Sequence, residues 1–249
     1  MVTNDSPEAV EEVLWMHFFP QAHKPDHSHE MDAQDCDAPF EQYYRDHIRK
    51  LLMVRRRQRY LAKNNYHVTR LEYLLTLFPD ARFVIPVRNP EQQIASLIKQ
   101  HRLFCALNAT DSRVSKQLQR SAHYEFGPLR CPILVDKDRQ ARYRPDLDDV
   151  DWYASQWADV YGFLRKRIDE NPTLANACLI VRYDDICSHT ETTLSRVFAH
   201  LDLDDSWAEE IIESYGLRVS APDYYKVDFS ARQQERILTI TSDIADTYL

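Results

Sequence analysis

Apolar residues recur at helical spacing along much of the chain and gather into short runs at three places. Residues 83–87 form a continuous apolar run after a Pro-Asp turn, a pattern typical of a buried strand. Residues 178–183 give a second such run, and residues 59–63 are predicted to form a third, short strand. Because helical patterns separate the runs, the sequence predicts parallel strands joined by right-handed helical crossovers.

The remaining periodic segments predict helices. They cover residues 7–19, 40–58, 67–78, a segment opened by Asn89, most of 105–127, 151–170, 190–201 and 207–215, with a last helix after Ser230. Gly216 is placed to end the helix over 207–215, and Gln233 is placed to complete a capping box with Ser230. Residues 128–150 suggest a long loop with a possible strand at 133–135. Without a repeat, a linker or a low-complexity tract, we expect one domain over residues 1–249.

Composition is that of an ordinary globular chain. Of the 249 residues, 44% are hydrophobic and 28% charged, and the net charge of −8 argues against a nucleic-acid binder that relies on a basic field. The five cysteines are odd in number and lack CxxC spacing, so neither a disulfide framework nor a zinc site is indicated. No apolar run is long enough to span a membrane and no signal-peptide pattern is present, so we expect a cytoplasmic protein without a membrane segment.

One stretch departs from the acidic balance. Six basic residues lie within eleven positions: Arg49, Lys50, Arg55, Arg56, Arg57 and Arg59. Such a run is usually a solvated helix face, and the alternative is a surface that faces an anion. Both interpretations stay open at this point.

A histidine-rich segment over residues 21–39 invites a metal hypothesis. It contains His23, His27 and His29 among several acidic residues, but their spacing matches no zinc template. We therefore expect no bound metal.

The turn after the central strand carries the clearest candidate chemistry. Arg88 follows the strand, Asn89 is a good N-cap, Pro90 suits the first helical position, and Gln92 stands where a capping box has Glu or Gln. Ser96 lies two turns up the same helix face, about 10 Å along the axis. A guanidinium and a hydroxyl so placed can hold one phosphate, and open α/β sheets bind ligands at this edge. The alternative is an ordinary strand-turn-helix with an exposed arginine and an unrelated serine.

A family resemblance favours the phosphate interpretation. Phe78-Pro-Asp-Ala-Arg-Phe-Val, then Val87-Arg-Asn-Pro, then Ser96 resembles the 3′-phosphate-binding segment of sulfotransferases, which use 3′-phosphoadenosine 5′-phosphosulfate (PAPS). Val181-Arg-Tyr-Asp-Asp-Ile and the helix after it resemble the family's second recurrent block, and the similarity extends from about Pro7 to the C-terminus, most closely to the bacterial-type branch. The resemblance implies a P-loop-like parallel sheet flanked by helices, PAPS as the sulfate donor, and contacts from Arg88 and Ser96 to its 3′-phosphate.

The resemblance also implies a catalytic lysine, for which Lys63 is the candidate. Family members carry Glu before this lysine or His two residues after it, whereas this chain has Ala62 and Asn65. The candidate bases that remain are His67, His101 and His123. We favour His67 because it lies within one helical turn of Lys63 and histidine suits proton transfer near neutral pH.

The resemblance also implies a Gly-rich loop that holds the 5′-phosphosulfate of the donor. No such loop is present in the sequence. The three glycines, Gly127, Gly162 and Gly216, stand apart from any such loop. We therefore expect an N-terminally shortened sulfotransferase fold without the first strand and loop, with negligible turnover unless they are supplied. The alternative is a non-catalytic, degenerate fold that serves as a binding or regulatory protein. The acceptor, a hydroxyl or amine on a carbohydrate, lipid, small molecule or peptide, and the oligomeric state stay open.

Overall fold

The computed structural model describes residues 11–135, 149–203, 205–215 and 227–249. By its internal contacts the chain divides into two compact units. The first unit comprises Met1–Pro79 and His101–Pro145, and the second comprises Asp80–Gln100 and Asp146–Leu249. Each unit has its own buried core, and the single-domain organisation stays a prediction.

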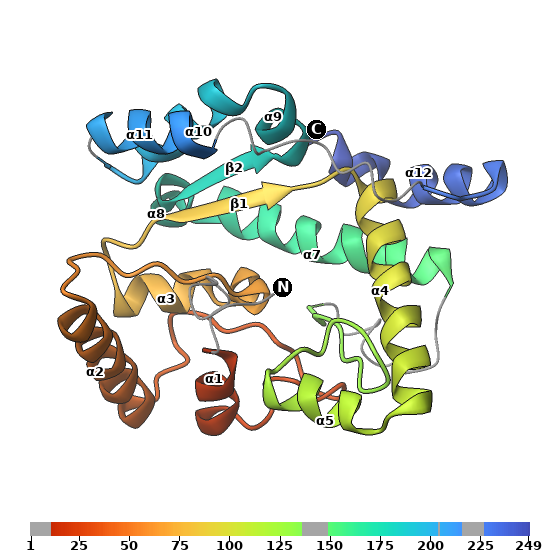
Figure 1. Ribbon diagram of the computed structural model, residues 1–249, viewed down its shortest axis with the longest axis horizontal. Helices are drawn as coiled ribbons and strands as arrows, with labels where there is room; N and C mark the ends of the chain where they lie inside the picture. Colours follow the sequence, from red (N-terminus) through yellow and green to blue (C-terminus); the bar gives the residue numbers. More distant parts are fainter. Residues whose placement is uncertain (1–10, 136–148, 204, 216–226) are drawn as a thin grey trace. The chain divides into compact units, whose positions relative to one another are not determined.

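The regular elements of the first unit are helices (Figure 1). Several buried aromatic side chains form part of its core. Its elements are α1 (Glu12–Phe18), α2 (Ala38–Arg55), the 3₁₀ helix η1 (Asn65–Thr69), α3 (Leu71–Leu77), the end of α4 (Pro90–Thr110) and α5 (Arg113–Arg120). Trp15 of α1 is fully buried, with its ring centroid 4.5 Å from that of Phe40 and 5.6 Å from that of Tyr44, both on α2. The first pair is tilted and the second is edge-to-face, and these ring contacts hold α1 against α2.

The C-terminal end of α2 is closed by a Schellman motif. Arg57 N–H donates to Leu52 O at 2.9 Å and Arg56 N–H donates to Met53 O at 3.2 Å. Arg56 occupies the left-handed position with φ 51°, where glycine is the residue without steric cost. The motif therefore stores backbone strain at Arg56.

Replacing Arg56 by glycine should raise the free energy of unfolding by about 0.5–1 kcal/mol, because glycine relieves the left-handed strain. Arg55→Gly is the matched control: Arg55 has helical geometry at the end of α2, so glycine there should lower the free energy of unfolding by up to about 1 kcal/mol. Urea denaturation of both variants provides the measurement. Equal destabilisation by the two substitutions would contradict the strain argument.

A small parallel sheet lies at the centre of the second unit. Strand β1 (Phe83–Val87) pairs with β2 (Cys178–Arg182), and the register places Val87 opposite Arg182. The helices are the start of α4, then α7 (Val150–Glu170), α8 (Pro172–Ala177), α9 (Tyr183–Ser188), α10 (Thr190–His200), α11 (Asp205–Tyr215) and α12 (Ala231–Ala245). Helix α12 packs along α7 (Figure 1), where Arg236 forms an ion pair with Asp151 at 2.7 Å.

The sequence correctly predicted several elements. Strands over 83–87 and 178–182 are confirmed as parallel neighbours, and Ser230 and Gln233 form the expected capping box. The fold is a helix-rich α/β arrangement, in agreement with the predicted class, while the P-loop-like detail and the missing N-terminal strand stay predictions. The proposed cap at Gly216 lies outside the described residues.

Three predictions were wrong. Residues 59–63 form no strand beyond an isolated bridge at Lys63, because this exposed, polar segment lacks the continuous apolar run of a buried parallel strand. The helix predicted over 67–78 is divided at Arg70 into η1 and α3. Residues 133–135 form no strand in the described part of the chain.

Among the described residues, no helix combines the length and the apolar character needed to cross a membrane.

Candidate active site

The first part of the site is the turn from β1 to α4, in the second unit. The side chain of Asn89 accepts a hydrogen bond from Glu91 N–H at 3.0 Å, as expected of an N-cap. Gln92 does not act as the sequence suggested: its side-chain oxygen accepts from Arg88 Nε–H at 3.2 Å. Gln92 therefore orients the guanidinium of Arg88 from the first turn of α4.

Tyr183 forms the other side of the Arg88 environment. Because β1 and β2 are parallel with Val87 opposite Arg182, Arg88 and Tyr183 leave the sheet at the same edge, one residue beyond the paired strands. The Arg88 Cζ atom lies 4.9 Å from the centroid of the Tyr183 ring, within the range of a cation–π interaction. The sequence did not reveal this partner, although Arg88 follows one predicted strand and Tyr183 ends the other.

The start of α4 is fixed to α7 by the half-buried amide of Gln93. The side-chain oxygen of Gln93 accepts from Trp157 Nε1–H and from Tyr161 O–H, each at 3.2 Å. Ser96 lies one turn further along α4, on the face expected from its spacing, and is half-buried. Arg88 and Ser96 therefore belong to one rigid strand–helix segment, and their contact with a common phosphate stays a prediction.

Lys63 and His67 lie in the first unit, around η1. Lys63 is exposed at the isolated bridge, and Asn64 caps η1 by accepting from Tyr66 N–H at 2.9 Å. The His67 side chain is 14% exposed, and its Nε2 lies 3.2 Å from Oε2 of Glu11, whose side chain is 3% exposed. The structure thus pairs the favoured base candidate with a buried carboxylate.

Glu11 is held by three side chains. Besides His67, the hydroxyls of Tyr44 and Tyr60 donate to Oε1 of Glu11, the former at 2.9 Å. Burial opposes ionisation of Glu11, but the hydrogen bond and charge of His67, helped by Tyr60 and Tyr44, hold the Glu11 pKa below its ordinary value. Glu11 is therefore a carboxylate at neutral pH and favours His67 with its proton on Nε2.

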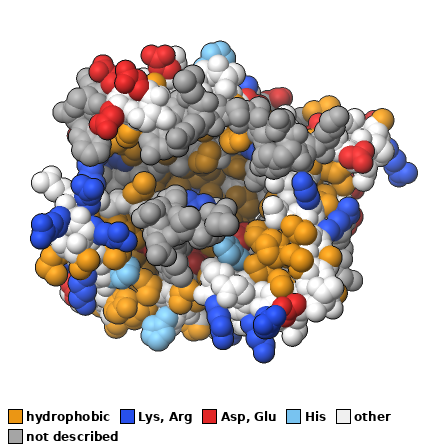
Figure 2. Space-filling view, in the orientation of Figure 1, with side chains coloured by type: hydrophobic (Ala, Val, Ile, Leu, Met, Phe, Trp, Pro, Cys, Tyr) orange, Lys and Arg blue, Asp and Glu red, His pale blue; other side chains and the backbone are white. Residues whose placement is uncertain are grey.

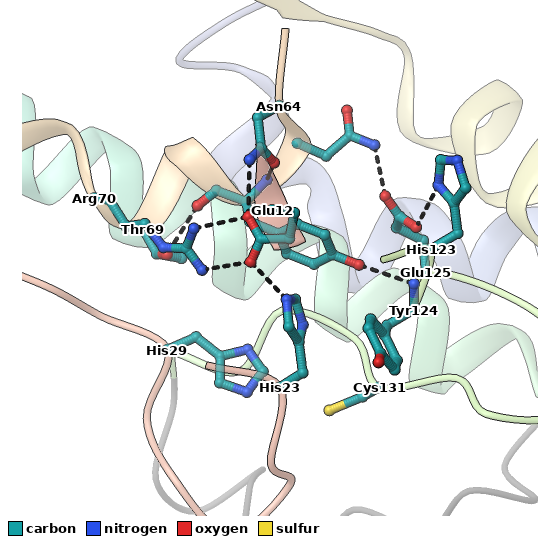
Figure 3. A network of polar contacts seen from close by, with 12 residues as sticks. Glu12, His23, His29, Asn64, Thr69, Arg70, His123, Tyr124, Glu125 and Cys131 are labelled. Atoms are coloured by element: carbon teal, nitrogen blue, oxygen red, sulfur yellow. Dashed lines mark hydrogen bonds and ion pairs between the residues drawn. The ribbon is translucent and has the colours of Figure 1, made fainter. Parts of the chain in front are cut away.

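The adjacent Glu12 is the centre of a second buried network (Figure 3). Arg70 donates to both oxygens of Glu12 at 2.8 Å, and Asn64 Nδ2–H donates to Oε2 at 2.8 Å. His23 Nε2 lies 2.6 Å from Oε1. The guanidinium of Arg70 also lies 4.6 Å from the centroid of the Trp15 ring.

The Glu12 network holds a charge in the interior of the first unit. Burial would raise the Glu12 pKa, but the charge of Arg70 and the hydrogen bonds from His23 and Arg70 lower it to about 2. The Arg70 side chain is 1% exposed and that of Glu12 5%. Glu12 lies on α1 and Arg70 lies between η1 and α3. Their ion pair therefore joins these elements and positions the segment that carries Lys63 and His67.

Three other histidines of the first unit, His29, His101 and His123, have structural partners. His29 Nδ1 accepts from Leu134 N–H at 3.3 Å, and burial lowers the His29 pKa to about 4. His101 Nδ1 accepts from Gly127 N–H at 3.2 Å, and His123 forms an ion pair with Glu125 at 3.5 Å. Within the described ranges no three His, Cys, Asp or Glu side chains group closely enough to hold a metal ion. None of the five cysteines forms a disulfide.

The glycines in the described part of the chain have structural roles. Gly127 has φ 84°, and a Cβ there would lie 2.8 Å from Leu118 Cδ1. A Cβ at Gly162 in α7 would lie 3.3 Å from Ile244. Neither belongs to a loop that could surround a phosphate, and Gly216 lies outside the described residues.

The four predicted site residues thus fall into two pairs. The second unit contains Arg88 and Ser96, and the first contains Lys63 and His67. Their assembly around one ligand stays a prediction.

Comparisons with known proteins relate the chain to one family of enzymes. The model of the sulfotransferase family matches residues 4–126, which include Lys63, His67, Arg88 and Ser96. Omega-hydroxy-beta-dihydromenaquinone-9 sulfotransferases of Mycobacterium bovis and Mycobacterium tuberculosis are each 28% identical to the chain over 153 residues. No solved structure matches the chain significantly.

The match to these relatives spans 61% of this chain and 30% of the relatives' length. Residues 4–126, just under half of the chain, are thus similar to the sulfotransferase family, as the sequence resemblance predicted.

Proposed function

We propose that the protein binds PAPS and transfers its sulfuryl group to a hydroxyl or amine acceptor. The observation that carries the proposal is the Arg88 guanidinium at the carboxyl edge of the parallel sheet, oriented between Gln92 and Tyr183. A fixed guanidinium at this edge suits a phosphate, because it offers a planar set of donors and needs little reorganisation on binding. Ser96 would donate a further hydrogen bond to the same 3′-phosphate.

Lys63 and His67 would supply the chemistry. Sulfuryl transfer requires a cation near the bridging oxygen and a base that removes the acceptor's proton. Lys63 is the proposed cation. His67 is the proposed base: with Nε2–H donated to Glu11, its proton-accepting atom is Nδ1, which is buried and has no hydrogen-bond partner among the described residues.

The relatives' name suggests an acceptor class. They are named for a hydroxylated menaquinone, a lipid that bears a hydroxyl group. We therefore propose a lipid hydroxyl as the acceptor in preference to a carbohydrate, a peptide or a small molecule. A cytoplasmic location stays a prediction.

Binding of adenosine 3′,5′-bisphosphate tests the donor half of this proposal. Its affinity should fall as salt rises from about 50 to 500 mM, because screening weakens the attraction between Arg88 and a multiply anionic ligand. Ser96→Ala should weaken binding by about 0.5–1.5 kcal/mol, the value of one neutral donor. Lys63→Ala should leave the affinity nearly unchanged, since this ligand lacks the sulfuryl group. Titration calorimetry at several salt concentrations provides the measurement, and a salt-independent affinity would count against the proposal.

A further inference from the structure

The last turn of α2 and the segment after it form an exposed surface on which basic and aliphatic side chains alternate. Residues 53–59 are all exposed, and so are Arg49, Lys50, Leu61 and Lys63. Met53 and Val54 are each 73% exposed and Leu61 80%. We call this surface, residues 49–63, the basic-aliphatic patch.

Helical geometry places the patch opposite the core of the first unit. Phe40 and Tyr44 bury one face of α2 against Trp15. Met53 follows Tyr44 by nine residues, about two and a half turns, so it lies on the opposite face. Arg49 and Met53, like Lys50 and Val54, are four residues apart and therefore lie one above the other.

The Schellman motif extends the patch beyond the helix. It turns the chain at Arg56, so that the last turn of α2 is followed directly by Arg56, Arg57 and Arg59. Between Asp46 and Glu72 the sequence contains no acidic residue. Asp46, at the near end of the patch, is paired with Arg49 at 3.2 Å. Figure 2 shows Lys and Arg side chains beside hydrophobic ones on the side of the molecule where α2 lies.

The charge of the patch contrasts with the chain as a whole. The net charge is −8, yet this stretch is strongly positive. At physiological salt the Debye length is about 8 Å, and charges further away than this are largely screened. An anionic surface in contact with the patch therefore interacts more strongly with the cations of the patch than with acidic residues elsewhere on the protein. The complementary partner is therefore anionic, and it must also accept aliphatic side chains.

We propose that the basic-aliphatic patch docks the protein on the surface of an anionic phospholipid bilayer. Lys and Arg would lie among the headgroups, while Met53, Val54 and Leu61 would enter the boundary with the acyl chains. A polynucleotide satisfies the charge but not the aliphatic residues, because exposed bases stack on aromatic rings. The proposal does not rest on the 3′-phosphate site, whose residues Arg88 and Ser96 lie in the second unit.

Sedimentation with vesicles tests the proposal on the full chain. The probes are vesicles of phosphatidylcholine alone and of phosphatidylcholine with about 30% phosphatidylglycerol. The parent should sediment with the second composition and not with the first. The triple variant Lys50→Gln/Arg55→Gln/Arg57→Gln should bind the anionic vesicles about a hundredfold more weakly, since each basic residue near such a surface contributes about fivefold.

A matched triple variant controls for net charge. Lys24→Gln/Lys116→Gln/Arg120→Gln removes three exposed cations of the same unit outside the patch, and it should bind like the parent. Met53→Ser/Val54→Ser/Leu61→Ser should lose binding at every salt concentration while circular dichroism shows an unchanged fold. Equal loss in the control variant, equal binding to neutral vesicles, or no binding by the parent would overturn the proposal. A fourth outcome would also overturn it: the protein binds polyuridylate as tightly as it binds vesicles, and the serine variant binds polyuridylate as well as the parent does. The surface would then be a general polyanion site.

Discussion

Replacing Arg70 by methionine should lower the free energy of unfolding by about 3–5 kcal/mol, because it leaves the Glu12 carboxylate buried without its compensating charge. Both side chains are almost fully buried, and Arg70 donates to both carboxylate oxygens at 2.8 Å. Methionine keeps most of the side-chain volume beside the Trp15 ring. The loss of stability therefore reports on the charge and hydrogen bonds of Arg70 more than on its packing.

A second substitution separates the charge effect from general damage. The double variant Glu12→Gln/Arg70→Met removes both charges and should recover a large part of the loss. As a control, Arg113→Met breaks a 2.7 Å ion pair with Asp111 in which the arginine is 86% exposed, and it should change stability by less than about 1 kcal/mol. Urea denaturation gives all four free energies. A double variant that is no more stable than Arg70→Met would contradict the account.

The same network should make the parent acid-sensitive. The folded-state Glu12 pKa is depressed from 4.5 to about 2, so its contribution is present above pH 4.5 and is lost as pH falls toward 2. Glu12→Gln should flatten the pH dependence of stability in this range.

Arg88→Ala should weaken binding of adenosine 3′,5′-bisphosphate tenfold or more, since a charge-assisted hydrogen bond to phosphate contributes about 1.5–3 kcal/mol. Arg88→Lys should recover the affinity only in part, because lysine lacks the planar fork that Gln92 and Tyr183 orient. Arg82→Ala is the matched control: it removes an exposed arginine from the residue before the same strand. Titration calorimetry on the three variants provides the measurement, and an equal loss in Arg82→Ala would show that the effect is not specific to the turn.

The β1–α4 turn could be predicted because its signals are local. An apolar run, an arginine, an N-cap and a proline follow one another within eight residues, and each has a direct structural consequence. Tyr183 could not be paired with Arg88 in this way. Their proximity depends on the register of two strands separated by more than ninety residues, which no short-range pattern specifies.

The buried carboxylates were missed for a related reason. Glu11 and Glu12 are adjacent acids at the start of a predicted helix, where acidic residues are common and usually solvated. Three of their partners, Tyr44, His67 and Arg70, lie 33 to 58 residues away in the sequence. The strand predicted at 59–63 was wrong because this segment lacks the continuous apolar run of a buried parallel strand. Its Tyr60 instead donates a hydrogen bond to Glu11, 49 residues away, a contact that no short-range pattern specifies.

The central claim, that Arg88 recognises the 3′-phosphate of the donor, is tested most directly by comparing two ligands on two proteins. Adenosine 3′,5′-bisphosphate and adenosine 5′-monophosphate differ by the 3′-phosphate alone, so the ratio of their affinities isolates this group. The parent should prefer the bisphosphate by tenfold or more, and Arg88→Ala should bind the two ligands nearly alike. A preference for the bisphosphate that survives unchanged in Arg88→Ala would contradict the claim.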